Sequence, residues 1–385
     1  MKKIGPAVYL MNFLAFFAIS MVNTQMIPYL SKVGYGVMER GYILAANSIV
    51  AIGGQLLFGY LCDRCRKIRR FFGIAYVLLL FSSIAMFVVQ QELFFYHLFT
   101  VALMGGMVKV IMGLDETWML ELDQQNYGKL RAAGAMGLTI GSPIAGYLIR
   151  QFSYMSLVYS IIGISILLFV CLKKSPDAKR EGDERVNFKS LGLLLKNKAY
   201  LLLVTIFLLV YMIGTADQYV VIDKMLAIGA NNAQVGFKWA LQSFMEVPLF
   251  LGAAWILQKF KNYTLLIFGT VMYSLKFVCY GFSFHPWMII ATTTLQLVTL
   301  PIIMLTSKVL VNEITPKKLQ SSAQMFAMAI FIGVSGLITP LITSFLCDHI
   351  GYDWTLYTVA IFGIVPFLLI LWYKHMDKSD YQQSK

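Results

Sequence analysis

Charged side chains interrupt several long apolar stretches of this sequence, and they are the residues best placed to do chemistry. They are Lys109, Glu116, Asp217, Lys238, Glu246 and Lys276. An ionisable side chain at the centre of a membrane helix costs at least about 2.5–3.5 kcal/mol, so it marks a functional candidate. Equal depth along their helices predicts that Glu246 pairs with Lys276 and Asp217 with Lys238. A purely structural salt bridge is the alternative interpretation of each pair.

The stretch 94–120 carries the densest set of such candidates. Lys109, Glu116 and Asp123 recur every seven residues, so a helix places them on one stripe. We expect Lys109 and Glu116 to face a cavity and bind solute, because exposing either to lipid would cost too much. Two further candidates lie here. Arg131 is expected to form an ion pair with Glu121 or Asp123 at the end of the helix, and Trp118, off the stripe, is a candidate for substrate binding.

Uncharged amides add a second group of substrate-binding candidates. They are Asn23, Gln25 and Gln218. An amide offers both a donor and an acceptor, which suits a ligand rich in hydroxyl groups. Hydrogen bonding between neighbouring membrane helices is the competing interpretation.

The composition indicates the elements that must position these side chains. Hydrophobic residues make up 58% of the 385 residues and charged residues 13%, where soluble domains carry about 25% charged residues. A membrane-spanning helix needs about 20 apolar residues, so we predict an all-α membrane protein with twelve transmembrane helices. The predicted spans are 6–30, 40–62, 71–89, 94–120, 130–149, 154–172, 200–222, 233–257, 263–283, 287–310, 320–346 and 355–373.

The net charge of +13 would also fit a nucleic-acid-binding protein, but the positions of the charges exclude that class. With the N-terminus inside, 24 of the 32 Lys and Arg residues fall at the cytoplasmic ends of the predicted spans. This bias is the positive-inside pattern of membrane proteins. It predicts a multi-pass protein of the cytoplasmic (inner) membrane with both termini in the cytoplasm.

A polar stretch divides the chain into two sets of six spans. We predict an N-terminal bundle at 1–172, a cytoplasmic linker at 173–198 and a C-terminal bundle with a short tail at 199–385. Weak internal repetition supports the division. Gln25, Gly36 and Gly59 match Gln218, Gly229 and Gly252 at an offset of 193 residues, and Pro143 matches Pro340 at 197.

The loop after the second span reads Gly59-Tyr60-Leu61-Cys62-Asp63-Arg64-Cys65-Arg66-Lys67. It resembles the signature loop of the major facilitator superfamily, which implies two six-helix pseudo-repeats and alternating access. The resemblance implies that Gly59, Asp63, Arg64 and Arg66 form a conformational latch. A carboxylate there can pair with arginine and lie against a helix N-terminus. Cys65 departs from the small residue usual in that family, and a generic basic loop is the alternative.

A second resemblance lies at the start of the fifth span. The segment 127–137, with Tyr127, Gly128, Arg131, Gly134 and Gly137, is similar to the branch that includes lactose permease and nucleoside–proton symporters. Asp217-Gln218 and Lys276 are similar to positions of that branch in the seventh and ninth spans. The tenth span departs from it, because Gln296 stands where the branch has its proton-coupling histidine and Thr299 where it has a carboxylate. Neither side chain carries a proton at a useful pH.

We therefore expect a proton-coupled secondary transporter for a sugar, oligosaccharide or nucleoside, with Gln296 among the substrate-binding residues. The carboxylates left for coupling are Glu116, Asp217 and Glu246. The alternatives are a facilitator, a permease for small aromatic acids and a drug exporter. In an aromatic-acid permease, Lys109 and Lys276 would hold the carboxylate of the solute. We expect no enzyme activity, no metal and no cofactor besides the coupling proton. The expected partners are the solute and the lipid bilayer, and we expect a monomer.

Overall fold

The computed structural model of the chain describes residues 5–123, 127–177, 194, 196–315 and 320–383. Every regular element in these ranges is a helix. The first group of helices is α1 (Pro6–Asn23), α2 (Met26–Val33), α3 (Val37–Cys65), α4 (Ile68–Val88), α5 (Phe94–Leu122), α6 (Tyr127–Gln151) and α7 (Met155–Lys174). The second group is α9 (Lys198–Ala227), α10 (Asn232–Leu251), α11 (Ala253–Lys259), α12 (Asn262–Gly281), α13 (Pro286–Thr292), η1 (Thr293–Val298), α14 (Leu300–Glu313), α15 (Gln320–Met328), η3 (Ala329–Val334), α16 (Ser335–Phe362) and α17 (Ile364–Gln383).

Ten helical segments of the described chain are long and apolar enough to cross a membrane. Nine of them correspond one to one to predicted spans, and the tenth, the 50-residue segment Phe326–His375, covers most of the last two. The remaining predicted span of the second half, 233–257, contains the shorter helices α10 and α11. Its charges, Lys238 and Glu246, lower its apolarity.

Breaks in the helices follow from particular residues. Gly351 adopts φ 80° and ψ 170° inside α16, a conformation that residues with a Cβ rarely adopt, and it divides the 50-residue segment. The span made of α13, η1 and α14 is interrupted at Thr299, whose φ of −113° and ψ of −102° are not helical. Pro301 follows in the first turn of α14, where its missing N–H costs no helical hydrogen bond.

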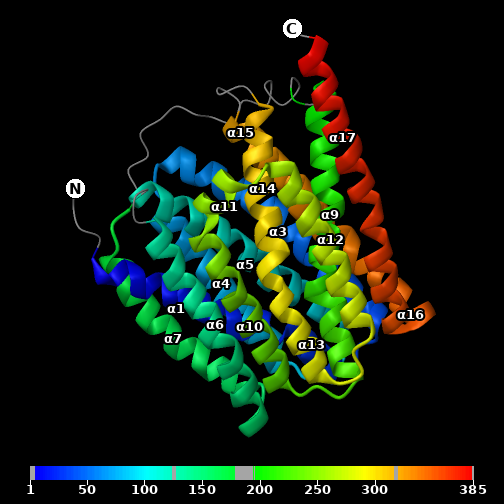
Figure 1. The fold of residues 1–385 in the computed structure, drawn as a ribbon. Coiled ribbons are helices and arrows are strands. Elements are labelled where there is room, and N and C mark those ends of the chain that lie inside the picture. Colours follow the sequence, from blue (N-terminus) through cyan, green and yellow to red (C-terminus); the bar gives the residue numbers. More distant parts are fainter. Residues whose placement is uncertain (1–4, 124–126, 178–193, 195, 316–319, 384–385) are drawn as a thin grey trace.

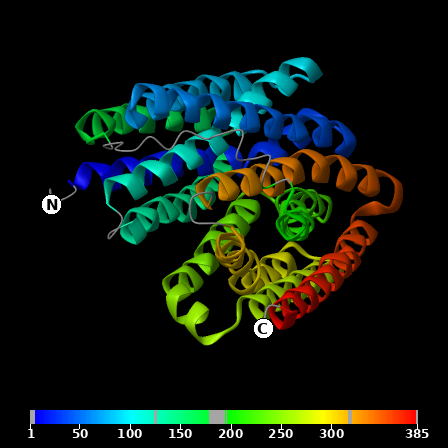
Figure 2. The same ribbon diagram turned by 90° about the horizontal axis from the view of Figure 1, so that it is seen from above.

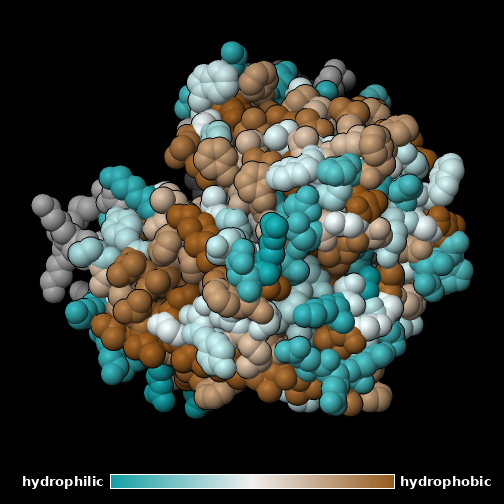
Figure 3. Space-filling view, turned by 90° about the horizontal axis from the view of Figure 1, so that it is seen from below, coloured by the Kyte–Doolittle hydropathy of each residue, from teal (hydrophilic) through white to brown (hydrophobic). Residues whose placement is uncertain are grey.

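The lateral surface of the molecule is apolar. Large hydrophobic side chains are widely exposed on it, among them Phe95 at 81%, Leu251 at 80% and Leu56 at 65%. A soluble monomer does not expose contiguous apolar area of this extent. Figure 3, which views the end opposite the C-terminal residues, shows hydrophilic residues gathered in the middle of that end between brown hydrophobic areas. The chain is therefore a multi-pass helical membrane protein, as the composition predicts.

The helices pack chiefly within the two parts of the chain. In the first part α1 packs on α6 and α7, and α5 packs on α3 and α4. In the second part α16 packs on α9 and α12, and α12 packs on α14. Figures 1 and 2 show the blue-to-green helices of the first part beside the yellow-to-red helices of the second. The largest contacts between the parts are those of α6 with α10 and of α3 with α16, and α2 also packs on α9 and α3 on η3.

These two joining pairs are built alike. A Cβ on Gly41 of α3 would lie 3.1 Å from the carbonyl oxygen of Pro340 in α16, and a Cβ on Gly236 of α10 would lie 3.1 Å from the Cα of Pro143 in α6. In each pair a glycine lets one helix approach a proline of the other part. Gly41 and Gly236 are 195 residues apart, close to the offsets found in the sequence. The glutamines of the predicted repeat differ, because Gln25 breaks the helix before α2 whereas Gln218 lies inside α9.

Candidate functional site

Asp217 of α9 lies between two lysines in the interior of the second part. Its Oδ2 accepts a hydrogen bond from Lys276 Nζ of α12 at 2.5 Å, and its Oδ1 accepts one from Lys238 Nζ of α10 at 3.2 Å. All three side chains have no exposed surface. Three buried charges close together are stable only because they compensate one another and are hydrogen-bonded.

Amide side chains extend this cluster in both directions. Lys276 Nζ also donates to Gln296 Oε1 at 2.6 Å, and Gln296 Nε2 donates to Glu246 Oε1 at 2.8 Å. On the other side Lys238 Nζ donates to Gln242 Oε1 at 2.7 Å. We call this set the central network: Gln242, Lys238, Asp217, Lys276, Gln296 and Glu246. Its formal charge is zero, because two carboxylates balance two ammonium groups.

The pairing within the central network differs from the prediction. The pair Asp217–Lys238 is present, but the predicted pair Glu246–Lys276 is wrong, because Lys276 binds Asp217 and reaches Glu246 only through Gln296. Equal depth in neighbouring helices was the basis of that prediction. Depth does not fix the rotation of a helix about its axis, and the rotation decides which side chains meet.

Gln296 reaches the network because of the irregular backbone around it. It lies in the 3₁₀ helix η1, just before the break at Thr299. The Thr299 hydroxyl lies 3.3 Å from both the backbone carbonyl and the side-chain oxygen of Gln296. This local structure holds the amide between a cation and a carboxylate. Its oxygen faces Lys276 and its NH₂ group faces Glu246.

Aromatic rings enclose the cations of the central network. Lys276 Nζ lies 5.5 Å from the ring centroid of Tyr273 and 5.4 Å from that of Tyr280. Lys238 Nζ lies 4.5 Å from the ring centroid of Trp239. A ring face attracts a nearby cation, and most strongly where water is excluded. Sequence reasoning missed these three rings, although Tyr273, Lys276 and Tyr280 follow one another at helical spacings of three and four residues.

Lys109 of α5 is a half-buried cation of the first part. Its Nζ donates to Ser48 Oγ of α3 at 2.9 Å, and a Cβ on Gly336 of α16 would lie 3.0 Å from that Nζ. The ammonium group therefore lies where the two parts meet. It forms no ion pair with any acidic side chain that the structure describes. This placement agrees with the predicted stripe, but no cavity around Lys109 is defined.

Glu116 lies seven residues further along α5 and contacts the other part of the molecule. Its Oε1 accepts from Lys308 Nζ of α14 at 3.1 Å and from the Tyr127 hydroxyl at 3.4 Å. The side chains of Glu116 and Lys308 are 35% and 51% exposed. This bridge between the parts therefore stands in a solvated environment, unlike the central network.

Two candidates of the first part lie elsewhere than predicted. Trp118 is fully buried against the ring of Phe72, and its Nε1 donates to the Pro176 carbonyl at 3.2 Å, so the structure gives it a packing role. Among the salt bridges of the described residues, none joins Arg131 to Glu121 or Asp123. The Arg131 guanidinium lies over the Phe16 ring instead, 5.8 Å from its centroid. Arg131 belongs to α6 and faces α1 there.

The structure places the three amide candidates in different surroundings. Gln25 is fully buried and bridges the parts, because its Oε1 accepts from Asn232 Nδ2 at 3.0 Å. Asn232, at the start of α10, also donates to the Tyr154 hydroxyl at 2.8 Å. Asn23 and Gln218 are half-buried at the end of α1 and inside α9. The structure thus favours interhelical hydrogen bonding for Gln25.

A buried ion pair closes the same end of the molecule. Arg40 Nη2 of α3 lies 2.6 Å from Asp223 Oδ1 of α9, and both side chains are about 5% exposed. Arg40 Nη1 also donates to the Tyr35 carbonyl. Sequence reasoning missed this contact between the parts. It singled out neither Arg40 nor Asp223.

The predicted latch lies at the opposite end of α3. Gly59 lies within α3, and Arg64 and Arg66 are exposed. Arg66 ends the helix in a left-handed conformation with φ 53°. The side chain of Asp63 lies outside the described residues, so its predicted contact with a helix N-terminus is untested.

The described ranges hold no group of three or more His, Cys, Asp or Glu side chains placed to bind a metal ion. The charged residues of the site are engaged with one another and with amides.

The comparisons with known proteins agree with the class of protein that the fold and the charged interior define. The MFS_1 like family matches residues 8–358, and the chain belongs to this family of major facilitator transporters. Over 350 residues it is 21% identical to the uncharacterized transporter YwbF of Bacillus subtilis (strain 168), covering 89% of this chain and 86% of that protein. The predicted resemblance to the major facilitator superfamily is confirmed.

Solved structures of transporters share the fold. The nucleoside transporter NupG superposes with a TM-score of 0.81 at 13% identity, over 96% of this chain and 98% of that one. A D-xylose-proton symporter gives a TM-score of 0.71 at 17% identity, over 95% and 96% of the two chains. At these identities the likeness concerns the fold.

Proposed function

We propose that this protein is a proton-coupled secondary transporter that moves a small polar solute, a sugar, oligosaccharide or nucleoside, across the cytoplasmic membrane by alternating access. The observation that carries the proposal is the central network. It joins three membrane helices and a 3₁₀ segment through buried charges that are costly in a membrane interior. The family and fold are those of membrane transporters, which supports transport rather than catalysis.

The proposal includes twelve spans with both termini in the cytoplasm. Ten candidate segments are present, the break at Gly351 divides the longest one, and α10 with α11 supplies a further span. An even number of spans puts both termini on one side. The concentration of Lys and Arg at the ends near the linker 173–198 favours the cytoplasm for that side.

Two six-helix bundles, 1–172 and 199–385, are the proposed moving bodies. Their contacts concentrate at the end that holds Arg40–Asp223 and Gln25–Asn232. At the other end the parts meet in the exposed Glu116–Lys308 bridge. This arrangement corresponds to an inward-facing state. In the outward-facing state we expect the Arg40–Asp223 contact to open, and Gly59, Asp63, Arg64 and Arg66 to form the latch.

Glu246 is the proposed coupling carboxylate. It is half-buried, and its carboxylate accepts a hydrogen bond from the neutral amide of Gln296. Asp217 is held by two ammonium groups and has no exposed surface, so protonating it would leave two buried cations uncompensated. A protonated Glu246 becomes a donor and competes with Lys276 for Gln296 Oε1. Proton binding would thus loosen the tie between Lys276 and Gln296.

Uptake of labelled nucleosides and glycosides into proteoliposomes, with and without an inward proton gradient, tests the proposal. We expect the gradient to drive accumulation of at least one solute. Glu246→Gln should abolish accumulation while retaining exchange, because the amide cannot release a proton. Glu39 is half-buried like Glu246 but lies outside the central network, so it provides a matched control, and Glu39→Gln should accumulate normally. Equal loss of accumulation and exchange in Glu246→Gln would assign Glu246 a structural role, and no effect of the gradient would indicate a facilitator.

One observation favours a second candidate, a permease for small aromatic carboxylic acids. Lys109 is a half-buried cation at the meeting point of the two parts, and it donates a hydrogen bond to the neutral hydroxyl of Ser48. A solute carboxylate would supply the missing counter-charge. A thermal-shift screen with sugars, nucleosides and aromatic acids separates the candidates, because each class should stabilise the protein only if it binds.

A further inference from the structure

A basic pocket lies at the ends of α4 and α7, away from the central network. Its volume is about 720 Å³. Five cationic side chains line it: Arg66, Lys67, Arg69, Arg70 and Lys173. We propose that this pocket binds the phosphate of an anionic phospholipid in the membrane leaflet on the linker side. The pocket shares Arg66 with the proposed latch, but the proposal does not depend on the identity of the solute.

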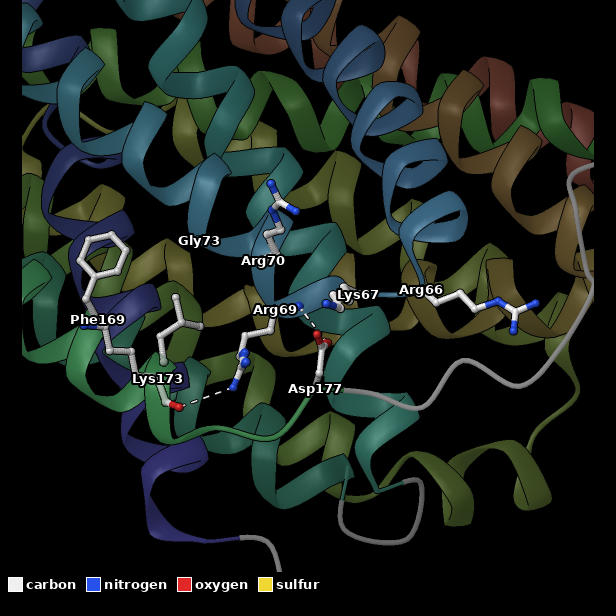
Figure 4. Close-up of a pocket in the computed structure, with 9 residues that line it drawn as sticks. Arg66, Lys67, Arg69, Arg70, Gly73, Phe169, Lys173 and Asp177 are labelled. Atoms are coloured by element: carbon white, nitrogen blue, oxygen red, sulfur yellow. Dashed lines mark hydrogen bonds between the residues drawn. The ribbon is translucent and has the colours of Figure 1, made fainter.

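The charge of the pocket calls for an anion. Among the described residues that line it, Asp177 alone is acidic. Its Oδ1 accepts the backbone N–H groups of Ile68 and Arg69, each at 3.0 Å, so this carboxylate caps the N-terminus of α4. Figure 4 shows Asp177 beneath the start of this helix, with Arg69 and Lys173 to one side and Arg66 directed away. The N–H groups at the start of α4 are therefore already bonded to Asp177. The five cationic side chains of the pocket outnumber this single carboxylate.

Arg69 is held in place before any ligand arrives. Its Nη1 donates to the Ser175 carbonyl at 2.8 Å and to the Lys173 carbonyl at 3.5 Å. These bonds fix the guanidinium between α4 and the segment that follows α7, while other N–H groups of the fork remain for a ligand. A fixed guanidinium loses less entropy on binding, and its geometry suits phosphate oxygens.

The remaining wall of the pocket is apolar. Phe169 and Leu172 of α7 and Gly73 of α4 form it. A Cβ on Gly73 would lie 3.2 Å from Leu172 Cδ2, so the glycine brings the two helices close. A site for a soluble anion needs no such wall. An apolar wall beside a cationic rim matches a molecule that has a phosphate at one end and hydrocarbon at the other.

Membrane-facing apolar side chains continue this wall toward the middle of the helices. Ile166, Phe169 and Lys173 follow one another at spacings of three and four residues, which places them on one stripe of α7. Ile166 is 63% exposed, and Ile74 on α4 is 41% exposed. Acyl chains can therefore lie along α4 and α7 while the phosphate stays among the cations at the helix ends. Basic pockets at this depth are typical of anionic lipid sites.

Native mass spectrometry of the full chain in detergent, with phosphatidylglycerol and phosphatidylcholine at equal concentration, tests the site. We expect the wild-type protein to retain phosphatidylglycerol preferentially. The double variant Arg70→Gln/Lys173→Gln should bind it about 25-fold more weakly, since each basic residue contributes roughly five-fold near an anionic surface. The single variant Arg70→Gln should lose about five-fold, and it provides the measurement if the double variant does not fold.

A matched control removes the same charge at the same side of the protein. Lys259 and Lys261 flank the connection between α11 and α12 and are exposed. The variant Lys259→Gln/Lys261→Gln should retain wild-type preference for phosphatidylglycerol. An equal loss in this control would show a general effect of net charge and would overturn the proposal.

A competition arm separates the lipid from a soluble source of phosphate. Excess inorganic phosphate and glycerol phosphate should not displace the bound phosphatidylglycerol, because they lack contacts with Phe169 and Leu172. If either compound displaced the bound phosphatidylglycerol completely at a concentration at which that compound itself binds the protein, the pocket would be a site for a soluble anion, and the proposal would be wrong. Equal retention of phosphatidylcholine and phosphatidylglycerol by the wild-type protein would likewise contradict the proposal.

Discussion

The two parts of the molecule treat their membrane charges in opposite ways. In the second part Asp217, Lys238 and Lys276 are fully buried and compensate one another inside one hydrogen-bonded set. In the first part Lys109 donates to the hydroxyl of Ser48, and Glu116 pairs with Lys308 of the second part in a half-exposed ion pair. A compensated network holds its geometry, whereas an isolated cation is available to a ligand. This difference suggests that one part carries coupling and the other supplies binding groups.

The largest effect should come from Asp217→Asn. The change leaves the ammonium groups of Lys238 and Lys276 buried without their shared anion, which costs about 3–5 kcal/mol for a broken buried pair. We expect loss of uptake and a clear fall in the unfolding temperature measured in detergent.

The double variant Asp217→Asn/Lys238→Gln is the control for that prediction. It removes one cation together with the anion, so part of the lost stability should return while uptake stays low. Wild-type stability of Asp217→Asn alone would mean that one of the lysines is neutral in the native protein, and the description of the network would need revision.

An intermediate effect is expected from Lys109→Gln. If the solute carries an acid group, its affinity should fall roughly ten- to 100-fold, because a hydrogen bond to a charged group is worth about 1.5–3 kcal/mol. Binding measured by thermal shift or by competition with uptake checks this. For a neutral solute the change in affinity should be small, and that outcome would remove the acid-permease candidate.

The smallest effect should come from Lys308→Gln. Exposed ion pairs contribute at most about 1 kcal/mol, and salt weakens them further. We expect a change in stability well below that of Asp217→Asn, and a smaller one still at high ionic strength. A loss as large as that of Asp217→Asn would show that the Glu116–Lys308 bridge is desolvated in the functional protein, which would erase the contrast between the two parts.

Much of the fold was predictable because membrane insertion depends on composition. Apolar length identified the helices, and they were found close to the predicted positions except where charges reduce the apolarity of α10. The motif at Gly59 and the segment around Arg131 identified the superfamily, which the family match confirms. Most of the residues of the central network were also named from the sequence, because charges within apolar stretches are conspicuous.

The partners of those residues were less predictable. Glu246 was assigned to Lys276, Arg131 to Glu121 or Asp123, and Trp118 to the substrate. The structure instead shows Glu246 bonded to Gln296, Arg131 over Phe16, and Trp118 bonded to the Pro176 carbonyl. The buried pair Arg40–Asp223 joins residues 183 positions apart and was missed.

The sequence by itself thus determined the class of protein, the approximate spans and the list of charged residues in the membrane. These properties depend on the residue types within single segments. Only the tertiary structure decided which charges meet, because pairing depends on how each helix is rotated and on irregular segments such as η1. Those are set by packing between distant segments, for example Gly41 against Pro340 and Gly236 against Pro143.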